Sequence, residues 1–477
     1  MYKPYANNKR RLAALVLAAM APSAYADDAS TDRIKQLEAM MQQMQQQRAE
    51  QDKQMQVMAE ELKAMQQQMA QGKEERVKEK GKSEGSPVYA AFKDGLTFED
   101  GSGNWKLQIN GRVQADYRTF DPSEWKDDVF SIRRARFGGT FSFLKDFAVR
   151  VEGEYANDNT GAKATTALTY AYLDYNRWKG AKIRAGQFKP FFGLERAYST
   201  NFIDFAELSL ATNNGSIFTS TYDRGVMVHG DPLPWLNYNA YVVNGTGQNN
   251  DDKNDGKDIG ARINANFASL AEIKNVVIHV GASASKGDIG KTSLTQSTEG
   301  NGTQFFNVTD LDERADRDRW GMESALAYGP VKLQAEYIDA NFEGVKSGTA
   351  FDRDIKAWYA DLNWLVTGES WADAYKSGVF GRVKPKQNFD NKSGWGAFEL
   401  GLRYSNFDGS EFRSLLAAST ASEAEAWTLG AKWILNPNAR LVLNYIQTEF
   451  DEPTELTING KTDDREKAIV LRAQYDF

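Results

Sequence analysis

Basic residues that alternate with apolar ones are the chemically most informative feature of this sequence. Arg112 and Arg118 recur in one such extended segment, and Arg134 and Arg136 recur in the next, with Arg133 between them. Because side chains alternate between the two faces of a strand, these arginines gather on one polar face. A guanidinium offers a planar fork of donors that suits phosphate oxygens, and rings of Arg or Lys select anions. The spacing therefore predicts an anion-binding face.

Residues for catalysis or metal binding do not form a recognisable pattern. The two histidines, His229 and His279, have no ligand spacing, and the chain has no cysteine. There is no G-x-S-x-G elbow, no P-loop and no G-x-G-x-x-G. The loop 251–256 resembles a calcium loop, but Lys253 and Arg262 occupy ligand positions. We therefore expect no enzymatic activity, no cofactor, no metal and no nucleic-acid partner.

The elements that carry the arginines are extended segments with one apolar and one polar face. At the carboxy-terminus Ile469, Leu471 and Phe477 share one face, while Arg472 lies on the other. Sixteen such segments are predicted as strands: 105–120, 129–144, 147–156, 167–177, 182–189, 224–232, 236–244, 258–268, 275–286, 319–329, 331–342, 355–366, 395–407, 426–436, 439–450 and 468–477. An even number of roughly ten-residue strands fits a bacterial membrane barrel. The predicted fold is an all-β, 16-stranded antiparallel transmembrane β-barrel preceded by an α-helical coiled coil.

A large soluble sandwich or propeller is the competing fold. A propeller needs a repeated blade motif, and the sequence has none. No run of 18 or more apolar residues is present, so helical membrane spans are not expected. The mean hydropathy of -0.59 is compatible with barrel strands, which are apolar only at every second position.

The connections between the segments alternate between tight turns and longer polar loops. The loop that follows Lys189 is unusual, because it is about 30 residues long and rich in phenylalanine. We expect it to fold into the lumen, with Lys189 and Arg196 at a constriction opposed by Glu195 and Asp204. Packing on a neighbouring subunit is the alternative. The connection 368–394 stands where a short turn is expected, and its structure is not predicted.

The polar faces of the segments carry more cations than acids, although the chain has a net charge of -7. Thirteen cations are predicted to point inward: Lys106, Arg112, Arg118, Arg134, Arg136, Arg150, Arg184, Arg262, Lys332, Arg403, Lys432, Arg440 and Arg472. Nine acids share these faces: Asp116, Glu152, Glu154, Asp174, Glu323, Glu336, Asp361, Glu399 and Asp476. The remaining acid is expected in loops and turns, so the lumen favours anions.

The first 87 residues differ in composition from the rest. Residues 1–26 have a basic start, an apolar stretch and an A-x-A site, which predicts a secretory signal peptide. Residues 27–72 lack proline, and from residue 30 their apolar residues keep a 3-4 spacing over about five heptads, which predicts a coiled coil. A solvated helix without a partner is the alternative. Residues 73–87 read as a charged linker, and 88–477 as the barrel.

Four stretches resemble the phosphate-selective porin O and P family of Gram-negative outer membranes. They are SIRRARFGG (131–139), AYLDYN (171–176), GQFKPFFGLE (186–195) and AFELGLRYS (397–405). The resemblance implies a trimeric sixteen-stranded porin with an inward third loop and a basic anion path. By motif position, it matches Arg133, Arg134, Arg136 and Lys189 to the family's channel-lining arginines and waist lysines.

We therefore expect a homotrimeric outer-membrane porin for small anions, with phosphate as the preferred substrate. Eight residues are predicted to line the pore: Arg112, Arg133, Arg134, Arg136, Arg150, Arg184, Lys189 and Arg196. The coiled coil is expected in the periplasm, where it could contact peptidoglycan or a periplasmic protein. A sugar or general-solute porin and a structural envelope tether remain as alternative functions.

Overall fold

The described part of the chain comprises residues 87–92, 95–156, 166–213, 217–218, 222–252, 255–450 and 456–477 of a computed structural model, with isolated helical residues at 42, 50, 53 and 60. The chain divides into two compact units, Met1–Gly85 and Ser86–Phe477. The predicted signal peptide and linker, and all but four residues of the predicted coiled coil, lie outside the described residues.

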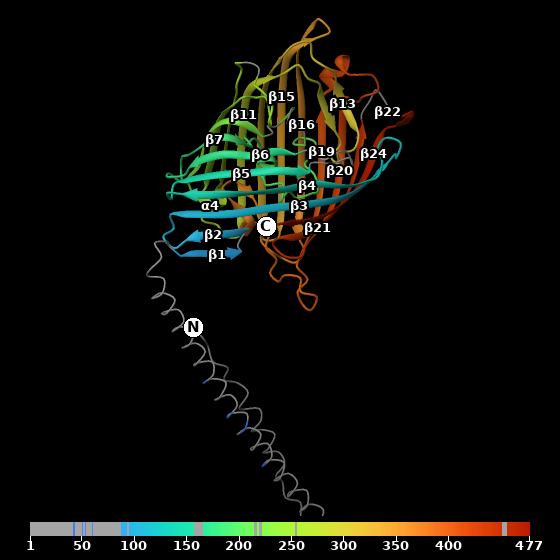
Figure 1. The fold of residues 1–477 in the computed structure, drawn as a ribbon. Coiled ribbons are helices and arrows are strands. Elements are labelled where there is room, and N and C mark those ends of the chain that lie inside the picture. The colour runs from blue at the N-terminus through green and yellow to red at the C-terminus, as the bar shows by residue number, and fades with distance from the viewer. Residues whose placement is uncertain are drawn as a thin grey trace, which may run out of the picture. The chain divides into compact units, whose positions relative to one another are not determined.

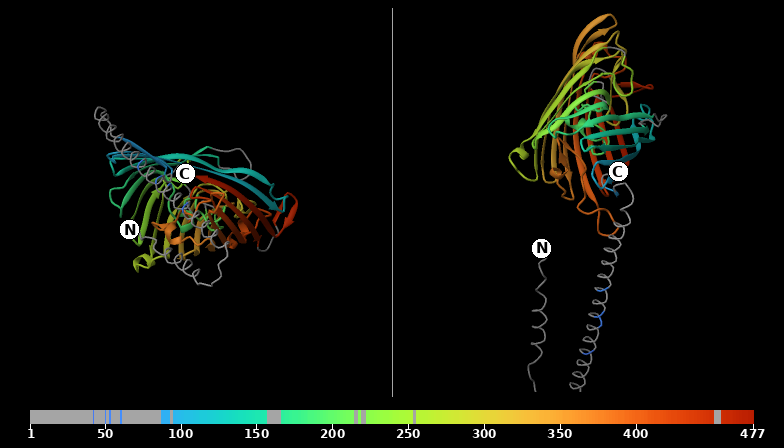
Figure 2. Two further views of the ribbon diagram at one scale, coloured as in Figure 1. Left: turned by 90° about the horizontal axis from the view of Figure 1, so that it is seen from below. Right: turned by 60° about the vertical axis from the view of Figure 1, so that its left-hand side comes forward.

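Sixteen antiparallel strands form the wall of the second unit (Figure 1). They are β3 (Trp105–Asp121), β4 (Val129–Phe143), β5 (Phe147–Ala156), β6 (Ala167–Tyr175), β7 (Lys182–Phe188), β8 (Asp223–Leu233), β9 (Leu236–Val243), β10 (Asp258–Asn266), β11 (Val276–Ile289), β14 (Ala315–Tyr328), β15 (Val331–Lys346), β16 (Thr349–Leu365), β19 (Ala397–Asp408), β20 (Glu423–Ile434), β21 (Ala439–Phe450) and β24 (Arg465–Asp476). Each pairs with the next, and Figure 2 shows the wall from two further directions.

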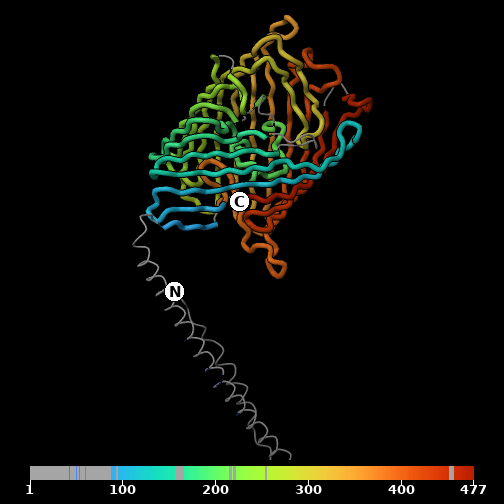
Figure 3. Tube along the Cα trace, viewed as in Figure 1, coloured from blue at the N-terminus to red at the C-terminus, as the bar shows by residue number. Residues whose placement is uncertain are grey.

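The last strand closes the barrel against the first. Residues Lys467 to Asp476 of β24 pair with Asp121 to Arg112 of β3, and Figure 3 shows the red end of the chain beside the blue strand. The hairpin of β1 (Val88–Phe92) and β2 (Leu96–Asp100) pairs with the first part of β3, next to the end of β24. Closure leaves no free edge in the sixteen-stranded wall, as spanning a bilayer requires.

Burial along the strands is inverted relative to a soluble protein. In β24, Ile469 and Leu471 are 43% and 47% exposed, whereas Arg472 is 1% exposed. The apolar side chains therefore face outward. Burying them among lipid chains stabilises the barrel by about 25 cal/mol for each Å² of apolar surface that is removed from water. No helix within the described ranges is long and apolar enough to cross a membrane.

The prediction of sixteen closed antiparallel strands is confirmed, and the strand ends differ from it by a few residues. Short elements in the connections were not predicted: α3 (Leu194–Ala197), α4 (Phe267–Leu270), α5 (Trp371–Ala374), η3 (Ser410–Leu415), β12 (Leu294–Ser297), β13 (Gln304–Val308), β17 (Tyr375–Lys376), β18 (Val379–Phe380), β22 (Leu456–Ile458) and β23 (Lys461–Asp463). The β1–β2 hairpin was also missed. Most of these segments are too short to show a period.

Connections from both ends of the barrel pack inside it. We call the end near the β4–β5 turn (144–146) the short-turn end, and the opposite end the long-loop end. At the long-loop end, an apolar core joins the β7–β8 and β11–β14 connections to strands β14–β16, β19 and β20. At the short-turn end, a second core joins the β7–β8 connection to the segment between β16 and β19. The inner wall formed by β3–β8 is mostly polar.

Candidate functional site

A bulge in β4 turns two consecutive arginines toward the lumen. The pairing of β4 with β3 shifts register between Gln114 and Ala115, so Gln114 faces Arg134 while Ala115 faces Ile132. Arg133 is the extra residue, and both Arg133 and Arg134 are buried. Strict alternation would place Arg133 outside, but a bulge reorients the side chain next to it. Two neighbouring guanidinium groups therefore face the lumen.

The connection between β7 and β8 enters the lumen, as the sequence predicted. Its short helix α3 begins after Gly193, whose φ is 72°, and a side chain at that position would collide with the Glu336 carboxylate. That carboxylate, on wall strand β15, accepts hydrogen bonds from the backbone N–H groups of Leu194 and Glu195 at 2.7 and 2.6 Å. A carboxylate at a helix start satisfies free N–H groups and fixes the helix in place.

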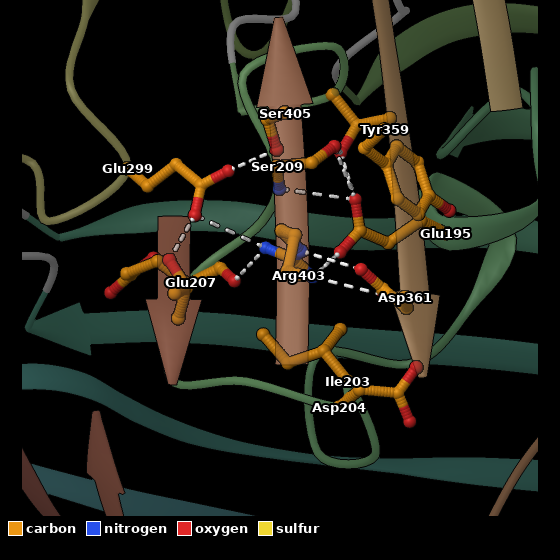
Figure 4. A network of polar contacts seen from close by, with 12 residues as sticks. Glu195, Ile203, Asp204, Glu207, Ser209, Glu299, Tyr359, Asp361, Arg403 and Ser405 are labelled. Atoms are coloured by element: carbon orange, nitrogen blue, oxygen red, sulfur yellow. Dashed lines mark hydrogen bonds and ion pairs between the residues drawn. The ribbon is translucent and has the colours of Figure 1, made fainter. Parts of the chain in front are cut away.

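Glu195 of this connection is held by a wall arginine rather than by a cation of its own segment (Figure 4). Arg403 Nη2 lies 2.6 Å from Glu195 Oε1, and Arg403 Nε lies 2.9 Å from Asp361 Oδ1. Glu299, from the β12–β13 hairpin, lies 3.7 Å from Arg403 Nη1 and accepts hydrogen bonds from Ser405 and Thr428. Arg403 is fully buried, so the cluster ties two connections to β16, β19 and β20.

Two further acids of the connection bind wall cations. Asp204 accepts two hydrogen bonds from Lys332 Nζ, at 2.6 and 2.7 Å. Glu207 Oε1 lies 2.6 Å from Arg118, 2.8 Å from Arg133 and 2.8 Å from Arg472. The three positive charges hold the pKa of Glu207 well below its usual range, despite its burial. The connection is therefore anchored by its carboxylates.

These contacts correct two expectations. Glu195 and Asp204 do not oppose Lys189 and Arg196, because they bind Arg403 and Lys332 instead. The cation surplus predicted for the lumen is also reduced. Acids expected in loops are carried inside by the connections, and they neutralise wall cations there. Folding of the connections changed this balance, and strand periodicity carries no information about it.

Lys189, Arg134 and Arg196 differ from the other inward cations. Lys189 Nζ donates to the carbonyl oxygen of Tyr198 at 2.7 Å, and Arg134 Nη1 donates to Gln114 Oε1 at 2.9 Å. Both acceptors are uncharged. Among the described residues, none of the three makes an ion pair within 4.0 Å. A cation shielded from water without a carboxylate in contact is unfavourable, and an incoming anion would relieve that cost.

The cations of this cluster lie close enough to influence one another. Burial lowers the pKa of Lys189 well below its usual range, and neighbouring guanidinium groups lower it further. Those groups belong to Arg196, Arg136, Arg112 and Arg134. Arg112 Nη1 donates to Thr200 Oγ1 at 2.5 Å, and Arg112 Nη2 lies 3.9 Å from Glu152 Oε1. The structure thus brings together five of the eight predicted residues, and Arg133 adjoins them in β4.

Arg136 is the cluster member that leads toward a row of tyrosines. Its Nη1 atom donates to Tyr222 Oη at 2.7 Å, and its Nε atom pairs with Glu154. Tyr222 meets Tyr170 edge to face, with ring centroids 4.9 Å apart. Tyr170 in turn contacts Tyr172, at 5.8 Å between centroids. The row therefore runs from Arg136 along β6 toward the short-turn end.

Arg150 and Arg184, the remaining predicted residues, stack on this row. The guanidinium carbon of Arg150 lies 4.4 Å from the Tyr170 ring centroid, and that of Arg184 lies 3.8 Å from the Tyr172 centroid. Each also binds a carboxylate: Arg150 pairs with Glu152, and Arg184 pairs with Asp174 through two hydrogen bonds. The Arg150 side chain is 29% exposed. This strip offers oriented donors with little net charge.

Several residues of the site were not predicted from the sequence. Tyr198 holds Lys189 through its carbonyl, and the type of residue gives no indication of such a role. Glu207 lies in a loop without periodicity, so its place among three arginines could not be inferred. Tyr170 and Tyr172 alternate with apolar residues on β6, which is a usable indication of an inward face. Within the described ranges, no group of three acidic, histidine or cysteine side chains could hold a metal ion.

The family described as phosphate-selective porin O and P matches residues 107–477. Porin O of Pseudomonas aeruginosa is 27% identical over 430 residues, which cover 83% of this chain and 94% of that protein. Two solved structures share the fold. An anion-selective porin from Comamonas acidovorans has a TM-score of 0.51 and 12% identity, and the match covers 78% of this chain and 100% of that one. The outer-membrane channel DcaP of Acinetobacter baumannii has a TM-score of 0.51 and 15% identity, and the match covers 80% of this chain and 99% of that one.

Proposed function

The chain belongs to the phosphate-selective porin O and P family, and on that premise we propose that it carries phosphate and related small anions across the outer membrane through the cationic side of its lumen. The outward apolar face of the sixteen-stranded wall meets lipid. The short-turn end would face the periplasm and the long-loop end the exterior, as in other bacterial barrels.

The cluster of Lys189, Arg134 and Arg196 carries this proposal. The described hydrogen-bond acceptors of Lys189 and Arg134 are neutral, and no carboxylate lies within 4.0 Å of the three cations among the described residues. An oxyanion can therefore replace its lost hydration water here without displacing a resident carboxylate. Arg112 adds a further guanidinium beside Thr200. Pore selectivity arises where such groups substitute for the hydration shell of the ion. The cluster is the selective waist of the proposed channel.

The tyrosine-backed arginines Arg136, Arg150 and Arg184 form the proposed exit from the waist. Conduction requires sites that bind an ion weakly enough to release it. Their charges are balanced by Glu154, Glu152 and Asp174. An anion there would meet guanidinium and phenol donors but little net positive charge. Release toward the short-turn end should follow.

The amino-terminal region is proposed to add export and attachment functions. Residues 1–26 would direct secretion, and residues 27–72 would form a periplasmic coiled coil joined to the barrel by residues 73–87. The heptad pattern needs partner helices without fixing their number, and a trimer is proposed because membership of the porin family implies one. The coil could contact peptidoglycan or a periplasmic protein. Transport rather than catalysis is proposed, because the chain belongs to a porin family.

Reconstitution in a planar bilayer tests the proposed function. In a salt gradient the reversal potential should have the sign of an anion current. Millimolar phosphate should block chloride current as it occupies the waist. A cation-selective reversal potential would refute the anion channel. Chloride current that phosphate leaves unblocked would retain an anion porin but remove phosphate as its substrate.

Charge reversal at the waist separates selectivity from overall charge. Lys189→Glu places an acid among the neighbouring arginines and should shift the reversal potential toward cations. Lys179→Glu makes the same charge change at an exposed turn residue and is the matched control. An equal shift in both variants would show that net charge, rather than the waist, sets selectivity.

A further inference from the structure

The connection between β16 and β19 crosses the inside of the short-turn end. It contains α5 and the β17–β18 hairpin, drawn in orange near the carboxy-terminus (Figure 1, Figure 2). Trp371 donates from its backbone N–H to the Gly329 carbonyl and from its indole to the Pro330 carbonyl, both at 3.0 Å. Arg382 pairs with Asp476 at the end of β24. These anchors, at the β14–β15 turn and at the end of β24, are well separated around the wall.

Strands β10 and β11, which lie far from β24 around the wall, hold the hairpin of this connection. Arg262 Nη2 on β10 donates to the Gly378 carbonyl at 2.9 Å. The Tyr375 hydroxyl and His279 Nδ1, on β11, are hydrogen-bonded at 2.7 Å. Contacts to β10, β11, β24 and the β14–β15 turn therefore fix the segment across the opening. A turn that only joins β16 to β19 in solvent would make no such contacts with distant strands.

Aromatic side chains of the segment contact the β7–β8 connection, which contains Lys189 and Arg196 of the waist. Phe380 is 1% exposed, and its ring meets the Tyr198 ring edge to face with centroids 6.1 Å apart. Trp371 packs against Phe380 at 5.9 Å. Lys332 Nζ lies 4.1 Å from the Trp371 ring centroid and also binds Asp204. The two connections thus share one core.

Tyr198 links this core to the waist. Its backbone carbonyl accepts the hydrogen bond from Lys189 Nζ at 2.7 Å, while its ring contacts Phe380 and its hydroxyl donates to Gln334. Displacing the ring would move the carbonyl that holds the ammonium group. A short series of contacts therefore runs from the short-turn end of the barrel to Lys189.

We propose that the connection between β16 and β19 is a positioning strut, in which Phe380 sets the place of Lys189 through Tyr198 and thereby the anion selectivity of the waist. The inference rests on the proposed function for its effect on selectivity. The positional part is independent of it. Phe380 contacts no permeating ion in this arrangement; it acts through Tyr198.

The test compares Phe380→Ala with Phe389→Ala. Phe389 belongs to the same segment but packs against Trp433, on the outer side. Phe380→Ala should weaken phosphate block roughly threefold or more and shift the reversal potential toward zero. Phe389→Ala should leave both unchanged. Phe380→Leu, which keeps apolar volume, should give an intermediate effect if the alanine variant does not fold.

A double-mutant cycle identifies the route of the effect. In a Lys189→Gln background, Phe380→Ala should cause no further shift in reversal potential. An undiminished shift would refute action through Lys189. Identical behaviour of the Phe380 and Phe389 variants, or a higher conductance with unchanged selectivity, would likewise refute the strut.

A cysteine reporter tests position without relying on anion selectivity. The chain has no cysteine, so Lys189→Cys introduces a unique thiol. Its rate of modification by a charged methanethiosulfonate reagent should change roughly threefold or more when Phe380→Ala is added, but not with Phe389→Ala. An unchanged rate refutes the strut. A changed rate in a channel that is not anion-selective supports it while rejecting the proposed function.

Discussion

Glu207→Gln is a demanding test of how the lumen distributes charge. Glu207 Oε1 lies 2.6 to 2.8 Å from guanidinium nitrogens of Arg118, Arg133 and Arg472, and Glu207 is 4% exposed. Glutamine keeps the shape and one acceptor oxygen but removes the charge. Truncating one partner of a buried charge network costs about 3–5 kcal/mol. Because Asp116 still binds Arg118 and Arg472, the lower end of that range is expected.

The same substitution should strengthen anion binding. It adds one net positive charge to the lumen. For an ion passing about 10 Å away, Coulomb's law gives roughly 0.4 kcal/mol at the dielectric constant of water and about 1.7 kcal/mol at an effective value of 20. Phosphate block should therefore tighten by roughly 2- to 20-fold. Lower stability combined with tighter binding is the expected outcome.

Two assays measure the two effects. Heat modifiability on gels reports the unfolding temperature of the barrel, and bilayer recording reports the phosphate concentration for half block. Glu124→Gln, at an exposed loop position, is the matched control. Unchanged stability together with unchanged or weaker block would show that Glu207 neither anchors the connection nor screens the waist.

Three further predictions concern the waist, its tether and the amino-terminal region. Because the pKa of Lys189 is lowered, its charge is lost as pH rises through a value below the usual lysine range. Anion selectivity should fall there, and Lys189→Arg should retain it; a reversal potential independent of pH up to the ordinary lysine range would contradict this. Lys332→Met leaves Asp204 buried without its partner, so current recordings should become noisier and conductance should rise. Adding Asp204→Asn should partly restore the wild-type recording. Equal noise in the single and double variants would count against the Lys332–Asp204 pair as a tether of the β7–β8 connection. Deletion of residues 30–72 should leave conductance unchanged in the bilayer, and dissociation into monomers on native gels would show that the coil holds the oligomer.

The sequence determined the wall of this protein. Alternation with a period of two is a local property, so it located all sixteen strands and assigned Arg472 and its equivalents to the inner face. The deviations occur where alternation is broken. The β4 bulge brought Arg133 inward, and no periodicity records a register shift caused by pairing with a neighbour.

Only the tertiary structure decided how the lumen is filled. The sequence predicted that the β7–β8 connection folds inward, but not that Glu195 would bind Arg403 on β19 rather than a cation nearby. Nor did it indicate that Phe380 would reach Tyr198 from the other end of the barrel. These contacts join residues far apart in the chain, and their pairing depends on where the closed wall places each strand. Periodicity fixes the face on which a side chain lies, whereas its partner across the lumen is fixed by three-dimensional distance.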